Sequence, residues 1–100
     1  MNKKQLILLC MLAVGGSVQA QQWPDTTAEA RHGTRWWWLG SAVDEKNLTY
    51  NLEEYARAGM GAVEITPIYG VQGNDANDIQ FLSPRWMEVL KHTQAEGKRT

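Results

Sequence analysis

The spacing of apolar residues changes several times along this 100-residue chain, and each spacing predicts a different element. Residues 6–14 form an uninterrupted apolar run. After a polar stretch, residues 35–39 predict a strand that contains three of the five tryptophans. Because side chains of a strand alternate between its faces, Trp36 and Trp38 share one face and Trp37 lies on the other. We therefore expect this strand to be covered on both faces, as in a parallel sheet flanked by helices.

Two amphipathic helices are predicted after this strand. The first carries an apolar stripe at helical spacing, formed by Leu48, Leu52, Tyr55 and Ala56. Asp44 is a suitable N-cap for it, and Gly59 suits the left-handed position after its last turn. The second helix carries a stripe formed by Trp86, Val89, Leu90 and Thr93. Ser83 and Pro84 favour its start as N-cap and first helical residue, and Gly97 predicts its end.

A second strand is predicted between the two helices, at residues 61–66, with Pro67 closing it. Val63 and Ile65 share the face that we expect to contact the helices, and Glu64 points to the other face. A long loop rich in glycine, asparagine and aspartate follows this strand.

The order of strand, helix, strand, loop and helix is typical of parallel βαβ units, and the predicted fold class is α/β. Two strands cannot close a sheet, and about 80 residues arranged in this way bury only a small core. We therefore expect residues 35–100 to be the opening part of a larger α/β domain. Residues 21–34 are expected to form an irregular lead-in to it.

The first 20 residues have the pattern of a secretory signal peptide. Lys3 and Lys4 form a basic start, the apolar run follows, and the segment ends in Ser-Val-Gln-Ala. The run of nine apolar residues is too short to span a membrane, which needs about 20. We therefore predict cleavage after Ala20, export to the periplasm and no stable association with a membrane.

The composition of the chain limits the kinds of partner that we expect it to bind. The single cysteine, Cys10, lies in the predicted leader, so the exported chain has neither a disulfide nor a thiol nucleophile. Without Lys3 and Lys4, eight basic and eleven acidic residues remain, a formal net charge of −3. A mildly acidic chain without a basic patch is a poor partner for nucleic acid or for an anionic membrane surface. We expect neither as a partner.

Several stretches of the chain carry a resemblance to a known family. They are Arg-Trp-Trp-Trp-Leu-Gly at 35–40, Tyr-Ala-Arg-Ala-Gly-Met-Gly-Ala-Val-Glu-Ile at 55–65, Thr-Pro-Ile-Tyr-Gly at 66–70 and Ser-Pro-Arg-Trp at 83–86. Over residues 23–99 the chain resembles the start of the catalytic domain of glycoside hydrolase family 106, the secreted bacterial α-L-rhamnosidases. The resemblance implies the opening βαβα units of a (β/α)8 TIM barrel, incomplete in this chain.

The same resemblance implies an inverting glycosidase that acts on α-L-rhamnosides of plant or microbial polysaccharide and that depends on calcium. Inversion requires a general acid and a general base whose carboxyl groups lie ~6.5–9.5 Å apart. The family places both later than residue 100, so no residue of this chain inherits a catalytic role, and no calcium ligand is identified. The alternative is a truncated, non-catalytic fragment. A carbohydrate-binding module is disfavoured, because such modules are usually β-sandwiches.

Four residues are candidates for binding the carbohydrate substrate. Glu64 is expected near the carboxyl end of its strand, where the active sites of barrel enzymes lie. Its carboxylate could accept a hydrogen bond from a sugar hydroxyl. The alternative is a structural carboxylate that is paired with a basic residue. Trp37 and Trp38 could stack on a sugar ring, although runs of aromatic residues more often pack in a core. Tyr69 lies on the long loop, and long loops at this end of a strand often carry function.

The patterns that could bind a metal are weak. Asp75, Asn77 and Asp78 alternate like calcium ligands, but the glycine and the terminal glutamate of an EF-hand loop are missing at the required spacing. We expect an ordinary solvated loop there and assign no metal ligand. His32 has no partner at metal-binding spacing, and His92 is expected on a polar face of its helix.

Overall fold

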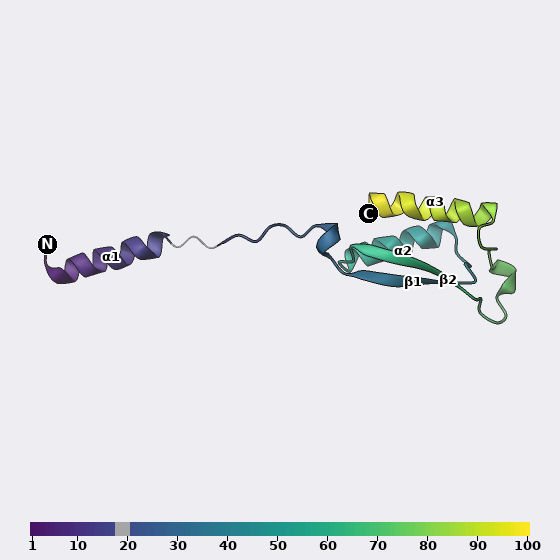
Figure 1. The fold of residues 1–100 in the computed structure, drawn as a ribbon, viewed down its shortest axis with the longest axis horizontal. Coiled ribbons are helices and arrows are strands. Elements are labelled where there is room, and N and C mark those ends of the chain that lie inside the picture. The colour runs from purple at the N-terminus through teal and green to yellow at the C-terminus, as the bar shows by residue number, and fades with distance from the viewer. Residues whose placement is uncertain (18–20) are drawn as a thin grey trace.

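The computed structural model describes residues 1–17 and 21–100, and this part of the chain contains two strands and three α-helices (Figure 1). The strands are β1 (Gly33–Leu39) and β2 (Ala62–Ile68). The helices are α1 (Lys3–Ser17), α2 (Glu45–Arg57) and α3 (Pro84–Arg99), and short 3₁₀ turns lie at Ala28–Ala30 and Asp75–Asn77. Figure 1 shows α1 apart from the body that β1, β2, α2 and α3 form.

The two strands pair in parallel, with Trp36 opposite Ile65 and Trp37 opposite Thr66. A parallel pair needs a crossover connection, and α2 provides it. Both strands are longer than predicted, since β1 begins at Gly33 and β2 continues to Ile68. Residues 21–100 therefore form a small α/β unit with a two-stranded parallel sheet.

The core lies on one face of this sheet. It is formed by Trp36, Trp38, Leu48, Leu52, Trp86 and Val89, which come from β1, α2 and α3. Trp38 meets both other tryptophans edge to face, with ring centroids 5.8 Å from Trp36 and 6.2 Å from Trp86. Such pairs add about 0.5–1.5 kcal/mol beyond the burial of their area. The stripes predicted for the two helices supply the remaining core residues.

The predicted caps of the helices are confirmed. Asp44 accepts a hydrogen bond from the backbone N–H of Asn47 at 2.9 Å, which caps α2. Ser83 accepts one from the backbone N–H of Trp86 at 3.2 Å, with Pro84 as the first residue of α3. Gly59 follows α2 with a φ of +90°, a conformation that glycine adopts without steric cost.

Two predicted ends are wrong. Pro67 lies inside β2 and does not close it, and Gly97 lies inside α3, which continues to Arg99. The carbonyl of Ile68 accepts a hydrogen bond from Gly40 on the β1 side, so the neighbouring Pro67 nitrogen faces away from β1 and no ladder bond is lost. A glycine inside a helix costs only about 1 kcal/mol, which the packing of α3 offsets.

The predicted opening of a (β/α)8 barrel is also wrong. The sheet has two strands in the order β1-β2, and no barrel unit occurs in residues 1–17 or 21–100. Closing a barrel requires tilted strands that pair around a complete ring. Here, in contrast, one face of a two-stranded ribbon packs on helices, and both of its outer edges lack a partner within those residues.

The expectation that β1 is covered on both faces is likewise wrong. Trp37 is 55% exposed, whereas Trp36 and Trp38 are buried. Both α2 and α3 contribute to the core on the side of Trp36 and Trp38. The other side, which carries Arg35, Trp37 and Glu64, is exposed and is called the open face below.

An ion pair and a histidine connect α2 to α3. The guanidinium of Arg85 donates to the carboxylate of Glu45 with an Nη2–Oε2 distance of 2.8 Å, and this hydrogen bonding lowers the pKa of Glu45 to about 2. His92 is half-buried, with Nε2 2.8 Å from Thr49 Oγ1 and 3.0 Å from the Glu45 carbonyl oxygen. His92 therefore lies between the helices and not on the polar face that its sequence position predicts.

The predicted leader corresponds to α1 and the residues after it. Residues 18–20 lie outside the described part of the chain, and with them Ala20 of the predicted cleavage site. None of the described helices combines the length and the apolar character that crossing a membrane requires. The signal peptide, its cleavage and the periplasmic location stay predictions.

Candidate functional site

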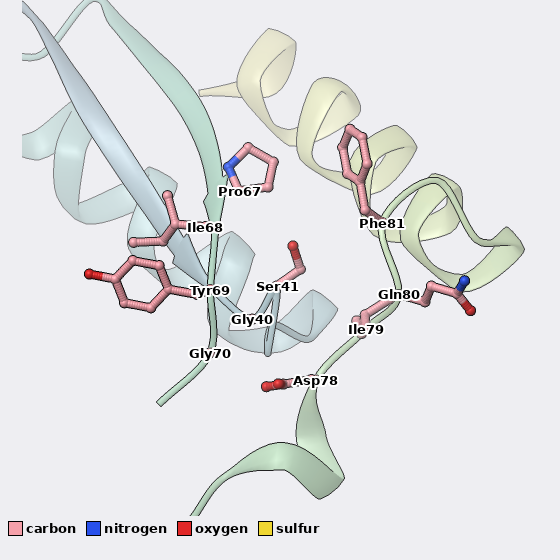
Figure 2. Close-up of a pocket in the computed structure, with 10 residues that line it drawn as sticks. All are labelled: Gly40, Ser41, Pro67, Ile68, Tyr69, Gly70, Asp78, Ile79, Gln80 and Phe81. Carbon is pink, nitrogen blue, oxygen red and sulfur yellow. The ribbon is translucent and has the colours of Figure 1, made fainter. Parts of the chain in front are cut away.

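A cleft with a volume of about 760 Å³ lies where the two parallel strands end (Figure 2). Three segments line it: residues 40–41 after β1, residues 67–70 at the end of β2, and residues 78–81 before α3. Ligands of parallel α/β sheets bind at the carboxyl ends of the strands, where the loops converge. The position of this cleft therefore makes it the first candidate for a binding site.

Gly40 joins the three segments of the cleft. Its N–H donates to the Ile68 carbonyl at 2.9 Å, and its carbonyl accepts from the N–H of Ile79 at 3.0 Å. Its φ of +62° lies in the left-handed region, which side chains with a Cβ rarely adopt. A glycine is therefore needed at this junction, and its backbone fixes the distance between the turn after β1 and the segment before α3.

Ser41 connects the cleft to the core. Its side chain is 3% exposed, and its Oγ accepts a hydrogen bond from Trp86 Nε1 at 3.1 Å. Phe81, which is 59% exposed, meets the same Trp86 ring edge to face with centroids 4.9 Å apart. Two residues of the cleft are thus held in place by one buried tryptophan of α3.

The carboxylate of Asp78 lies against two glycine backbones. A Cβ on Gly40 would collide with Oδ1, and a Cβ on Gly70 would lie 2.5 Å from Oδ2. Within residues 1–17 and 21–100 the carboxylate makes neither a hydrogen bond nor an ion pair, and the residue is exposed. Figure 2 shows it at one end of the cleft, with Ser41, Pro67 and Phe81 toward the other end.

The predicted substrate-binding residues do not come together in one site. Trp38 is 1% exposed and packs in the core, so it is not available for stacking on a sugar. Its indole N–H has no hydrogen-bond partner among the described residues. Trp37 and Glu64 lie on the open face, beside a hollow of about 600 Å³. Tyr69 lines the cleft and is 82% exposed, but Figure 2 shows its ring directed away from Phe81.

Glu64 lies in the first half of β2 and not near its carboxyl end, because the strand continues to Ile68. Its Oε2 is 3.5 Å from Nε of Arg35, the residue opposite it in the sheet. Both side chains are more than half exposed, and exposed pairs of this kind contribute little to stability. The paired alternative and the hydroxyl-binding role are therefore both compatible with this position.

The described residues that line the cleft can bind a ligand, but they do not include two acidic side chains. Asp78 is the only acidic residue among those that line it. An inverting glycosidase needs a second carboxyl group at ~6.5–9.5 Å, so these residues alone lack the pair. A cleft with a carboxylate at one end and aromatic and prolyl surfaces toward the other can hold a hydroxylated ligand.

The described residues contain no cluster of acidic, histidine or cysteine side chains that would suit a metal ion. No group of three or more His, Cys, Asp or Glu residues within them could hold a metal ion. Of the alternating residues in the long loop, the Asn77 amide donates to Asn74 Oδ1 at 2.7 Å, and only Asp78 reaches the cleft. The calcium dependence that the family resemblance implies stays a prediction without ligands in this chain.

Sequence reasoning missed the residues that shape the cleft, namely Gly40, Ser41, Asp78 and Phe81. One signal could have indicated them. Gly-Ser follows the first strand and Tyr-Gly follows the second, and glycines at the carboxyl ends of parallel strands allow a ligand to approach the backbone closely.

Comparison of the chain with models of protein families, with curated proteins and with solved structures gives no match.

Proposed function

We propose that this chain is the N-terminal portion of an exported glycoside hydrolase, an inverting α-L-rhamnosidase that acts on plant or microbial polysaccharide. The observation that carries the proposal is the cleft at the carboxyl ends of β1 and β2, which is lined by one exposed carboxylate and by the exposed aromatic residues Tyr69 and Phe81. Both groups suit a sugar, because hydroxyls donate to carboxylates and the apolar face of the ring packs on aromatic side chains. The choice of α-L-rhamnosides as the substrate class rests on the family resemblance over residues 23–99.

In this proposal the chain binds substrate and the acid–base pair comes from elsewhere in the protein. The cleft takes one sugar unit, and Trp37 and Glu64 on the open face are further contacts for a longer substrate. An exposed indole such as that of Trp37 offers a flat apolar surface for stacking. The predicted leader directs the protein to the periplasm, where it can act on polysaccharide outside the cytoplasm.

The test is hydrolysis by the product of the complete reading frame from which these 100 residues come. We expect release of 4-nitrophenol from 4-nitrophenyl α-L-rhamnoside, with the β-anomer of rhamnose as the first product seen by NMR. The matched control is the corresponding α-D-mannoside, which should react poorly. A stop directly after codon 100, with no hydrolysis, would support the alternative of a non-catalytic fragment. Release of the α-anomer first would contradict inversion.

A further inference from the structure

We propose that Asp78 is the hydroxyl-binding carboxylate of a saccharide subsite in the cleft, accepting hydrogen bonds from two adjacent hydroxyls of one sugar ring. The inference deepens the proposed function and rests on it. It assigns a role to a residue whose sequence context predicts only a solvated loop.

The carboxylate of Asp78 lies between the ends of the two strands. Gly40 and Gly70 leave room for it where any Cβ would interfere, so the two strand ends are shaped around this group. The Ile79 N–H bonded to Gly40 holds the next residue of the chain against the turn after β1. The carboxylate is thus placed by the backbone of three segments.

The carboxylate of Asp78 has no hydrogen-bond or ion-pair partner in the described residues. An ionised carboxylate has about four acceptor positions. Asp44 uses its own carboxylate to cap α2, and Glu45, Glu53 and Glu54 pair with arginines. Asp78 makes no such bond within residues 1–17 and 21–100, although its carboxylate lies close to Gly40 and Gly70. Its oxygens are therefore free to accept hydrogen bonds from a ligand.

The charge and the lining of the cleft favour a neutral, hydroxylated ligand. An unpaired carboxylate repels anions, and a divalent cation would need more acidic ligands than this cleft offers. Ile79 lines the cleft beside Asp78, and Pro67 and the exposed ring of Phe81 line it toward the other end; these surfaces suit the apolar face of a sugar. Two carboxylate oxygens can accept from two neighbouring hydroxyls, and these charge-assisted bonds are stronger than neutral ones. A neutral sugar with adjacent free hydroxyls fits these features.

The experiment measures binding of methyl α-L-rhamnopyranoside to the exported product of the complete reading frame by ¹H–¹⁵N TROSY NMR titration. We expect Asp78→Asn to weaken binding about tenfold or more, because it replaces charge-assisted hydrogen bonds with neutral ones. Asp75→Asn is the matched control, since Asp75 is also exposed and lies three residues earlier but does not line the cleft. The control should bind with the affinity of the unmodified chain.

A second variant tests position without removing the charge. Gly70→Ala places a Cβ 2.5 Å from Asp78 Oδ2 and forces the carboxylate to move, so it should also weaken binding severalfold. Gly97→Ala, where the added Cβ meets no atom within 4 Å, is its control and should leave the affinity unchanged. Dispersion of amide signals identifies variants that keep the fold, and Gly70→Ala keeps the test decisive if Asp78→Asn unfolds.

The outcomes separate the inference from the proposed function. Equal affinity of the Asp78→Asn, Asp75→Asn and unmodified chains, or no binding of any glycoside, overturns the role of Asp78. If methyl α-D-glucopyranoside binds through Asp78 and the rhamnoside does not, the subsite stands and the rhamnosidase assignment fails. If the complete enzyme hydrolyses rhamnosides equally well with Asp78→Asn, the function stands and the subsite is refuted.

Discussion

The hydrogen bond between Trp86 and Ser41 offers the sharpest test of how the cleft is attached to the core. Trp86 Nε1 donates to Ser41 Oγ at 3.1 Å, and both residues are buried, at 6% and 3% exposure. Ser41→Ala removes the acceptor and leaves the indole N–H without a partner in a site that water does not reach. We expect the variant to unfold more easily than the unmodified chain.

The size of the effect follows from the cost of an unsatisfied buried donor. Orphaning a buried polar group costs about 1–3 kcal/mol, so Ser41→Ala should lower the free energy of unfolding by that amount. The backbone adds a second, separable contribution. Ser41 has a φ of +49°, and left-handed backbone costs a residue with a Cβ about 1–2 kcal/mol.

Ser41→Gly therefore separates the hydrogen bond from the backbone strain. It loses the same hydrogen bond, but glycine relieves the left-handed strain at an entropic cost of about 0.5–1 kcal/mol. We expect Ser41→Gly to be more stable than Ser41→Ala by roughly 0.5–1 kcal/mol, which is the difference of these two contributions. Without strain at this position, glycine would be the less stable of the two.

The assay is urea unfolding followed by tryptophan fluorescence, with midpoints compared at equal slopes. A double-mutant cycle with Trp86→Phe isolates the pair, because phenylalanine retains an aromatic ring and has no N–H to orphan. In the Trp86→Phe background, Ser41→Ala should cost much less than it does alone. The reasoning is refuted if Ser41→Ala costs the same in both backgrounds, or if it changes stability by less than about 0.5 kcal/mol.

Three further predictions concern the open face, the helix pair and the leader. Glu64→Gln in the complete enzyme should lower kcat/KM about 10- to 150-fold without unfolding it, as expected for one lost charge-assisted hydrogen bond; unchanged kinetics would assign Glu64 to its pair with Arg35. The pKa of Glu45 is about 2, below its ordinary value of 4.5, so its contribution to stability is present above pH 4.5 and is lost as the pH falls toward 2. Arg85→Met should return the carboxyl titration of Glu45, followed by NMR, toward 4.5, and a titration that does not move would contradict the pairing. N-terminal sequencing of the exported protein should begin at Gln21, whereas a sequence that begins at Met1 would disprove the leader.

Local sequence predicts the helices well because their determinants lie within a few residues of one another. Asp44 and Ser83 cap the helices that follow them, and the stripes with Leu52 and Val89 point to the core. The alternation of the three tryptophans also predicts correctly that Trp37 faces away from its two neighbours. These features need no knowledge of the rest of the chain.

The features that the sequence predicts wrongly are determined by contacts with residues distant in sequence or by a larger assembly of strands. Pro67 is tolerated in β2 because its nitrogen faces away from β1, which only the register shows. His92 faces α2 because of how the helices cross, and a helical pattern alone does not reveal this. The barrel rests on the resemblance, and the two-stranded sheet does not reproduce it.

The cleft could be predicted only in part, because it depends on contacts between segments. Tyr69 belongs to it by its place after the second strand, which the sequence indicates. Asp78 reaches it through a hydrogen bond between its neighbour Ile79 and Gly40, nearly forty residues earlier in the chain. A loop residue placed by such a long-range backbone contact carries no local signal of its role.

The most direct test of the account is to locate a bound sugar on the chain by NMR. On titration with methyl α-L-rhamnopyranoside, we predict that the largest amide shifts occur at Gly40, Gly70 and residues 78–81, at the carboxyl ends of the two strands. Shifts confined to Trp37 and Glu64 on the open face, or no saturable shifts at all, would contradict the claim that this cleft is a saccharide site.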